Sequence, residues 1–255
     1  MCTLTIIPTP AGFRLATSRD EQRSRPAATP PVSRVIAGRP VLAPTDALAG
    51  GTWVGVSDTG LVMSLLNANP TPAPAMPPAA SLRSRGLIIP HLFAAVTARA
   101  AGALLQRMDL GVYAPFRLVA ADDAGVIDAR WDRASLVITD GGSGPACFVS
   151  SGLGDDAVAP RLDLFESFLR EFGATPAMQD RFHRHAWSDR PEISVAMSRH
   201  DARTVSVTVV EVPGVTSPAV MTYRDDSGVV RAELPRVDAR RAATRAPAAS
   251  RAGGA

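Results

Sequence analysis

Residues 1–21 read MCTLTIIPTPAGFRLATSRDE, which is two apolar runs joined by a Pro-Ala-Gly turn. Residues 3–7 and 13–18 are rich in apolar and β-branched side chains, and this composition favours strands. The turn between them indicates that the two strands pair as a β-hairpin. Because a hairpin returns the chain after its second strand to the start of its first, Asp20 is predicted to lie beside Cys2.

Short β-rich runs bounded by turn residues continue along the rest of the chain. This pattern is typical of antiparallel meanders rather than of alternating strands and helices. Further strands are predicted at residues 52–56, 61–66, 116–121, 126–131, 136–139, 146–150, 193–198, 204–212, 220–224 and 229–234. Hairpin turns are predicted at residues 58–60, 122–125, 140–144 and 225–228.

Apolar residues recur at helical spacing in residues 90–108 and again in residues 160–172. Pro160 suits the first turn of the second helix, and Gly173 suits the position after its end. A third, weaker helix is predicted over residues 176–187. Strands in two groups with helices between them favour two stacked sheets with helices packed outside, an α+β fold.

The chain has 255 residues, 46% of them hydrophobic, which is enough for one large domain with a full core. We expect this single domain to cover residues 1–235. Residues 70–80 are rich in proline, which has no N–H to donate, so they are predicted to form an exposed loop within the domain. Residues 236–255 contain mainly arginine, alanine and proline, and they are predicted to be a disordered tail.

Composition excludes several classes of function. All 27 basic residues are arginine, but they are interleaved with acids along the chain, so no nucleic-acid partner is expected. Two cysteines make no disulfide framework, and the four histidines are not at zinc-site spacings, so neither a metal nor a cofactor is expected. The sequence begins without a signal-peptide pattern and contains no transmembrane-length apolar run, so a cytoplasmic protein is expected. Its oligomeric state is left open.

Cys2 follows the initiator methionine directly, and cysteine is small enough for that methionine to be removed. We expect Met1 to be removed, which would leave a thiol and a free α-amine on one residue. The amine has a pKa of about 8 and the thiol of about 8.5, so the amine can accept the thiol's proton near neutral pH. The alternative is that Cys2 is an early residue of the first strand without a chemical role.

Two other residues could complete such a site. A carboxylate at Asp20 could orient the Cys2 ammonium and stabilise its charge. Residues 18–21 could equally be a solvated charged cluster at a turn. Asn67 follows the strand predicted at residues 61–66, where asparagine is commonly a turn former, but its amide could also stabilise an oxyanion.

Taken together, six segments in this order and spacing resemble those of the NRDE family, which includes the transport and Golgi organization proteins. They are Met1-Cys2-Thr-Leu-Thr, Arg19-Asp20-Glu21, Arg23 with Arg25-Pro26, Pro44-x-Asp46, Gly50-Gly51-Thr52-Trp53-x-Gly55 and Leu65-Leu66-Asn67. Segments at residues 150–154 and 194–210 agree with the same family. The resemblance covers roughly residues 1–212.

This family is similar to the N-terminal-nucleophile hydrolases, so the resemblance implies a four-layer αββα sandwich of two antiparallel sheets. By analogy with the choloylglycine hydrolases, Cys2 matches the nucleophile, Asp20 the orienting carboxylate and Asn67 the oxyanion donor. Further candidate pocket residues are Arg19, Trp53, Ser150 and Ser151.

Three positions depart from these patterns. Thr17 stands where those enzymes place an arginine, Ser18 stands where the family name has asparagine, and Ser198 stands where histidine is expected after Met197. Two functions of different class therefore remain. One is a hydrolase in which Cys2 attacks an amide or acyl carbon of a small molecule. The other is a non-catalytic carrier of a lipid, acyl or haem-like ligand.

Overall fold

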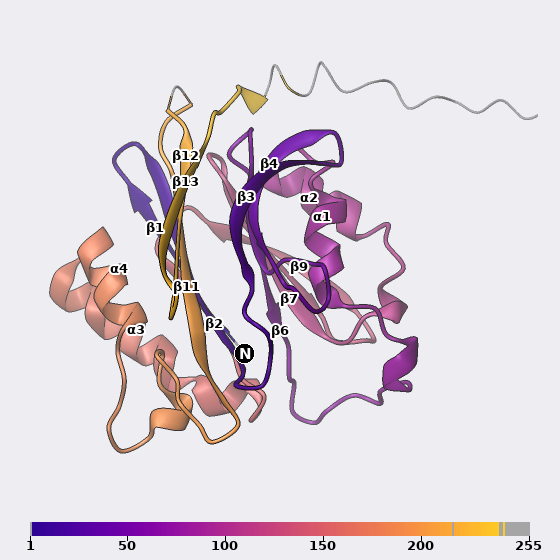
Figure 1. Ribbon diagram of the computed structural model, residues 1–255, viewed down its shortest axis with the longest axis vertical. Helices are drawn as coiled ribbons and strands as arrows, with labels where there is room; N and C mark the ends of the chain where they lie inside the picture. The colour runs from indigo at the N-terminus through magenta and orange to yellow at the C-terminus, as the bar shows by residue number, and fades with distance from the viewer. Residues whose placement is uncertain (1, 216, 240–241, 243–255) are drawn as a thin grey trace, which may run out of the picture.

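Thirteen strands form two antiparallel sheets in the computed structural model, which describes residues 2–215, 217–239 and 242 (Figure 1). In order across the first sheet, its strands are β10 (Ala146–Ser150), β1 (Cys2–Thr9), β2 (Gly12–Gln22), β11 (Ala202–Val212), β12 (Ala219–Asp225) and β13 (Gly228–Leu234). Those of the second are β3 (Thr29–Ile36), β4 (Arg39–Thr45), β5 (Val54–Ser57), β6 (Val62–Asn67), β7 (Phe116–Asp122), β8 (Gly125–Trp131) and β9 (Leu136–Gly142).

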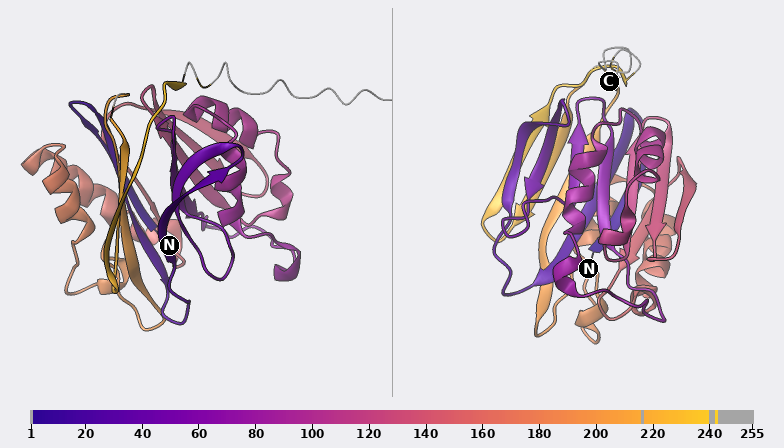
Figure 2. Two further views of the ribbon diagram at one scale, coloured as in Figure 1. Left: turned by 45° about the horizontal axis from the view of Figure 1, so that its top comes forward. Right: turned by 90° about the vertical axis from the view of Figure 1, so that its right-hand side faces the viewer.

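Helices cover the outer face of each sheet, which produces four layers (Figures 1 and 2). α3 (Pro160–Phe172) and α4 (Pro176–His183) pack on the first sheet, and α1 (Ile88–Leu92) and α2 (Ala98–Leu105) pack on the second. Five short 3₁₀ helices are at Ala79–Ser81, Arg85–Leu87, Leu110–Val112, Asp155–Val158 and Pro191–Ile193 of the described chain. The predicted α+β sandwich of two antiparallel sheets is therefore confirmed.

The first hairpin forms as predicted, with Cys2 directly opposite Arg19 and Thr9 opposite Gly12. β10 pairs with the other edge of β1 and places Ser150 opposite Cys2. Alternation along β1 sends the even-numbered side chains, Cys2 among them, between the two sheets. The odd-numbered side chains of β1 face α3 and α4.

Two strands, β3 and β4, were not predicted because prolines occur in both. β3 is at the edge of its sheet, where a missing N–H donor costs no ladder hydrogen bond. β4 pairs with β5 only through Val41 and Leu42, and its prolines flank that short contact. Prolines are therefore compatible with both strands.

Two strand-level predictions were wrong. Residues 193–198 are not a strand: Ile193 ends the 3₁₀ helix Pro191–Ile193, and the residues after it form a loop. The alternation of buried residues that suggested a strand arises because Val195 and Met197 pack inward from that loop. Residues 140–144 do not close a hairpin, because β9 and β10 belong to different sheets and this turn carries the chain from one to the other.

Among the helices, α3 has the predicted bounds, with Pro160 in its first turn and Gly173 after its end at a φ of 65°. The single helix predicted over residues 90–108 was wrong, since it is split into α1 and α2. Thr97 caps the start of α2 by accepting a hydrogen bond from the Ala100 N–H, which fixes the break. The helix predicted over 176–187 ends earlier, at His183.

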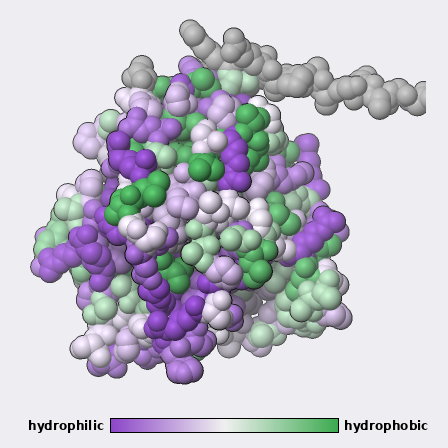
Figure 3. Space-filling view, viewed as in Figure 1, coloured by the Kyte–Doolittle hydropathy of each residue, from purple (hydrophilic) through white to green (hydrophobic). Residues whose placement is uncertain are grey.

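Hydrophilic and hydrophobic side chains are interleaved in small groups on the face in Figure 3. Within the described part of the chain, no helix has the length and apolarity needed to cross a membrane.

Arg236, the first residue of the predicted tail, is buried and donates hydrogen bonds to the carbonyls of Thr59 and Pro213. Most of the predicted tail, residues 240–241 and 243–255, lies outside the described residues.

His183 connects α4 to the first sheet. It is buried, and its two ring nitrogens are each 2.8 Å from a hydroxyl oxygen, of Thr5 on β1 and of Ser18 on β2. Desolvation, with smaller contributions from the positive charges of Arg14 and Arg161, lowers the pKa of His183 to about 3. The imidazole is therefore neutral in the folded protein at ordinary pH.

We expect this histidine to make the fold acid-sensitive. Above pH 6.5 the ring is neutral in both states, but between 6.5 and about 3 only the unfolded chain binds its proton. The free energy of unfolding should then fall by about 1.4 kcal/mol per pH unit, or about 2 kcal/mol by pH 5. Urea titrations from pH 7 to 5 should show a shallower slope in His183→Gln, whereas His91→Gln, at an exposed position of α1, should keep the wild-type slope.

Candidate active site

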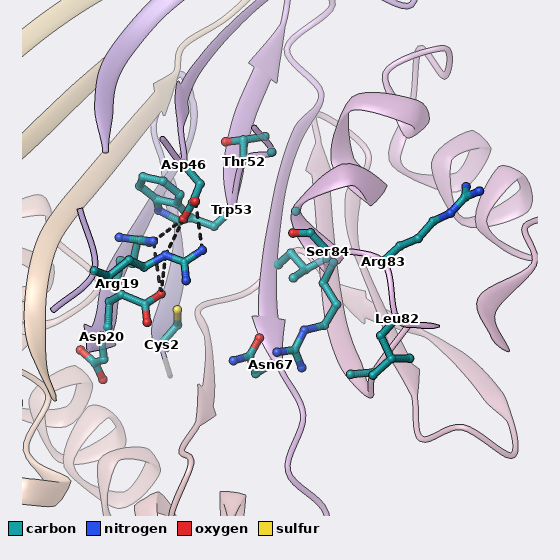
Figure 4. A pocket seen from close by; sticks show the side chains of 17 residues that line it. Cys2, Arg19, Asp20, Asp46, Thr52, Trp53, Asn67, Leu82, Arg83 and Ser84 are labelled. Atoms are coloured by element: carbon teal, nitrogen blue, oxygen red, sulfur yellow. Dashed lines mark hydrogen bonds and ion pairs between the residues drawn. The ribbon is translucent and has the colours of Figure 1, made fainter. Parts of the chain in front are cut away.

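A cavity of about 390 Å³ is formed at the end of the sandwich where β1 begins and β2 and β6 end (Figure 4). Both sheets contribute to its walls, as does the segment 82–86 that precedes α1. Five of the residues predicted from the sequence line it together: Cys2, Arg19, Asp20, Trp53 and Asn67. Hairpin register and strand ends thus bring these distant positions to one place.

The side chain of Cys2 points between the sheets at the cavity floor, and only 7% of the residue is exposed. Desolvation raises the pKa of its thiol, and the negative charge of Asp20 adds to this rise. The Asp20 backbone N–H, which hydrogen-bonds the sulfur, and the positive charge of Arg19 act in the opposite direction. A thiolate at this position therefore depends on neighbouring positive charge.

Asp20 is beside Cys2, but its carboxylate is on the helix-facing side of the sheet. Thr204 donates a 2.6 Å hydrogen bond to Oδ1, and Nη1 of Arg161 is 3.6 Å from Oδ2. Both members of this ion pair are buried. Burial raises the pKa of Asp20, and the Arg161 charge opposes the rise. Since Arg19 is opposite Cys2, Asp20 lies one residue further along, on the side of the Cys2 backbone nitrogen.

Arg161 reaches this position from the first turn of α3, and its side chain has no exposed surface. Its Nε donates to the carbonyl of Ile193 at 2.9 Å, and Nη1 donates to Oγ1 of Thr3 at 2.7 Å. Together with Asp20, these contacts fix a buried guanidinium behind the strand that carries Cys2.

A second charged network lies beside Cys2 in the cavity wall, where Figure 4 shows Arg19 and Asp46 next to it. Arg19 donates to Asp46 at 2.7 Å and to Glu21 at 3.2 Å, and its guanidinium lies 4.5 Å from the centre of the Trp53 ring. Arg25 donates hydrogen bonds to both carboxylate oxygens of Asp46, from Nε at 2.9 Å and from Nη2 at 3.0 Å. Burial raises the pKa of Asp46, but the hydrogen bonds from Arg25 and the Ala49 N–H, together with the positive charges of Arg25 and Arg19, hold that pKa below its ordinary value.

Asn67 and Arg85 stand on the side of the second sheet. Asn67 is the last residue of β6, and Figure 4 shows it across the cavity from Cys2. Arg85 begins the 3₁₀ helix after the proline-rich segment, and its Nη1 donates to the carbonyl of Pro115 at 2.8 Å. Burial lowers the pKa of Arg85, while the nearby Cys2 and Glu21 act to raise it.

Residues 1–140 match the family model described as Transport and Golgi organisation 2. The chain belongs to this family. The resemblance to the NRDE family drawn from the sequence is thereby confirmed. Arg19, Asp20 and Glu21, which are part of that resemblance, lie near the end of β2 and line the cavity. No curated protein matches the chain in sequence.

Solved structures similar to this Transport and Golgi organisation 2 family member share its fold. An N-acylethanolamine-hydrolyzing acid amidase ortholog from Caenorhabditis elegans has a TM-score of 0.58 at 16% identity, covering 82% of this chain and 92% of that one. Penicillin V acylase from Agrobacterium tumefaciens has 0.57 at 12%, covering 94% and 88%. The C2A mutant of conjugated bile acid hydrolase from Clostridium perfringens has 0.53 at 10%, covering 94% of each.

Two of the predicted pocket residues, Ser150 and Ser151, are buried beside the cavity rather than in its wall. Ser150 is opposite Cys2 on β10, and the Ser151 N–H donates to Asp155 at 3.0 Å. The structure also shows the contacts of two residues that depart from the family pattern. The hydroxyl of Ser18 is hydrogen-bonded to His183, and exposed Ser198 accepts a hydrogen bond from Arg23.

Sequence analysis of this family member missed Arg161 and Arg85 as site residues. Arg161 had no signal, because an arginine in the first turn of an amphipathic helix is ordinarily solvated. Arg85 follows the proline-rich loop, which was treated as exposed. Asp46 did carry a signal, since the Pro44-x-Asp46 segment was part of the family resemblance, but its partner Arg25 could not be assigned without the fold.

Proposed function

We propose that this protein is a cysteine N-terminal-nucleophile hydrolase that cleaves an amide or related acyl bond of a small molecule. The observation that carries the proposal is Cys2 at the start of β1, in a cavity that it shares with Asp20 and Asn67. Three proteins of similar fold are named as an amidase, an acylase and a hydrolase, which supports the same reaction class. The proposal requires that Cys2 be the first residue of the working enzyme.

In the proposed reaction, the α-amine of Cys2 takes the thiol proton, and the sulfur forms a bond to the substrate carbonyl carbon. The Asn67 amide donates to the oxygen that becomes negative. The carbon–nitrogen bond then breaks, and the departing amine takes the proton from the Cys2 ammonium. A water molecule attacks the thioester, the acid leaves, and the thiol and free amine are restored.

Asp20 has a positioning role in this proposal. Its place on the side of the Cys2 backbone nitrogen suits a carboxylate that orients the ammonium. Thr17 faces the space between the sheets, whereas the Asp20 carboxylate is on the helix-facing side, where Arg161 of α3 supplies the guanidinium beside it.

The alternative carrier of a lipid or haem-like ligand receives less support. A site for such a ligand is lined predominantly by apolar and aromatic side chains. This cavity is lined by arginines and carboxylates, with Leu65, Leu82 and Trp53 as its large apolar residues. We therefore favour a polar small-molecule substrate.

We propose that residues 1–235 act as one domain, since one core is shared by both sheets. Cys2 and Cys147 are both free thiols, which suits the reducing cytoplasm expected from the sequence.

Selective alkylation tests the nucleophile. A limiting dose of iodoacetamide at neutral pH should modify Cys2 at least about tenfold faster than Cys147, because reactivity follows thiolate content and the free α-amine of Cys2 and the Arg19 charge would stabilise its thiolate. Cys147 is half-buried against the core under α3 and α4, and burial raises the pKa of its thiol to about 12. Peptide mass spectrometry would give both rates, and intact mass would show whether Met1 is absent. Equal labelling, or full retention of Met1, would remove Cys2 from the proposed role.

A further inference from the structure

The charges around the cavity do not cancel. Arg19 and Arg25 share Glu21 and Asp46 as partners, which balances two positive groups against two negative ones. The third carboxylate of the cavity, Asp20, faces the buried guanidinium of Arg161 on α3. Arg85 is left over: among the described residues it forms no ion pair, although it lines the same cavity as Cys2.

The backbone holds Arg85 firmly at the cavity wall. The Thr52 N–H donates to the carbonyl of Gly86 at 3.0 Å, which ties the segment to the start of the second sheet. Gly51 approaches so closely that a Cβ there would lie 2.5 Å from the Gly86 carbonyl carbon. One guanidinium nitrogen is occupied by the carbonyl of Pro115, and the side chain remains half-buried.

We propose that Arg85 is the subsite for an anionic group on the substrate, which is then an acyl compound carrying a carboxylate or similar oxyanion close to the scissile bond. This inference rests on the proposed hydrolase function. A half-buried guanidinium without a carboxylate partner is costly, and an oxyanion matches its remaining planar donors. Arg83 is no substitute, because Figure 4 shows its side chain directed away from Cys2.

Two alkylating agents of nearly equal size test this directly. Iodoacetate and iodoacetamide both form a sulfur–carbon bond with a cysteine thiolate and release iodide, but only iodoacetate is anionic. The ratio of their rates at Cys2, iodoacetate over iodoacetamide, should exceed the same ratio for free N-acetylcysteine. In Arg85→Gln the ratio should fall about tenfold, the value of one charge-assisted hydrogen bond. Arg83→Gln removes an equal charge from the same wall segment, but one whose side chain points away from Cys2, and it should keep the wild-type ratio.

The ratio separates this role from simple thiolate stabilisation. If Arg85 only lowered the thiol pKa, both rates would fall together in Arg85→Gln and the ratio would stay constant, which would overturn the proposal. An equal fall of the ratio in Arg83→Gln would also overturn it, since the effect would then be general surface charge.

A binding measurement keeps the inference testable even if Cys2 is unreactive. Calorimetry of glutarate, a small dicarboxylate, with Cys2→Ala protein should give a dissociation constant about tenfold larger when Arg85→Gln is added. Slow alkylation of Cys2 combined with this loss of glutarate binding would contradict the proposed hydrolase function but support Arg85 as an anion-binding subsite. Equal glutarate binding with and without Arg85 would remove the subsite, whatever Cys2 does.

Discussion

Replacing Cys2 with alanine is expected to lower kcat/KM for amide hydrolysis by on the order of a thousandfold or more, because no other group would form the acyl-enzyme. A panel of fluorogenic N-acyl aminocoumarin amides, some with an acyl chain ending in a carboxylate, would provide the assay. Cys147→Ala is the matched control, since it removes the second thiol from the opposite face of the same sheet. It should leave turnover unchanged.

The loss must be separated from unfolding. The Cys2 side chain belongs to the core between the sheets, so removing its sulfur should cost about 1 kcal/mol of stability. Thermal unfolding followed by circular dichroism should therefore show a lower Tm but a cooperative transition. Hydrolysis that persists in folded Cys2→Ala protein would contradict the nucleophile assignment, as would its loss in Cys147→Ala alone.

What the sequence predicted best was local. The hairpin of β1 and β2 needs only a turn and two β-rich runs, and its register then decides that Cys2 meets Arg19 and that Asp20 follows. The placement of Asn67 in the same cavity as Cys2 could not be predicted from local patterns. It depends on two sheets being stacked so that β6 ends where β1 begins, and here the family resemblance supplied what periodicity could not.

The elements that were missed depend on contacts distant in sequence. Arg161 is 141 residues from Asp20 (161 − 20), and no local pattern distinguishes an arginine that will be buried under a sheet from a solvated one. β3 became a strand at a sheet edge despite its prolines, because β4 pairs with it along one side, with a shift in register between Thr29 and Val32 where the two prolines lie. The false strand at residues 193–198 shows the converse, in which inward packing of a loop imitates strand alternation.

Replacing Arg161 with methionine is expected to reduce the free energy of unfolding by about 3–5 kcal/mol. Methionine roughly fills the space of the aliphatic stem, but it leaves the buried Asp20 carboxylate without its guanidinium. It also leaves the Ile193 carbonyl without the Nε donor. Urea denaturation at pH 7 would measure the loss. Arg170→Met is the matched control, because Arg170 lies on the same helix, is exposed and has only a surface partner in Glu166.

The pH dependence of this loss identifies its cause. Without Arg161, the pKa of buried Asp20 should rise further, because desolvation would be unopposed by that charge. A carboxyl whose pKa is raised in the folded state binds its proton more readily there than in the unfolded chain, so lowering the pH should favour the folded variant. The difference between wild type and Arg161→Met should therefore shrink as the pH falls from 7 towards 5. Adding Asp20→Asn to Arg161→Met should recover part of the stability at pH 7 and remove that pH dependence. A loss that is constant with pH and indifferent to Asp20→Asn would show that Arg161 stabilises the fold by packing alone.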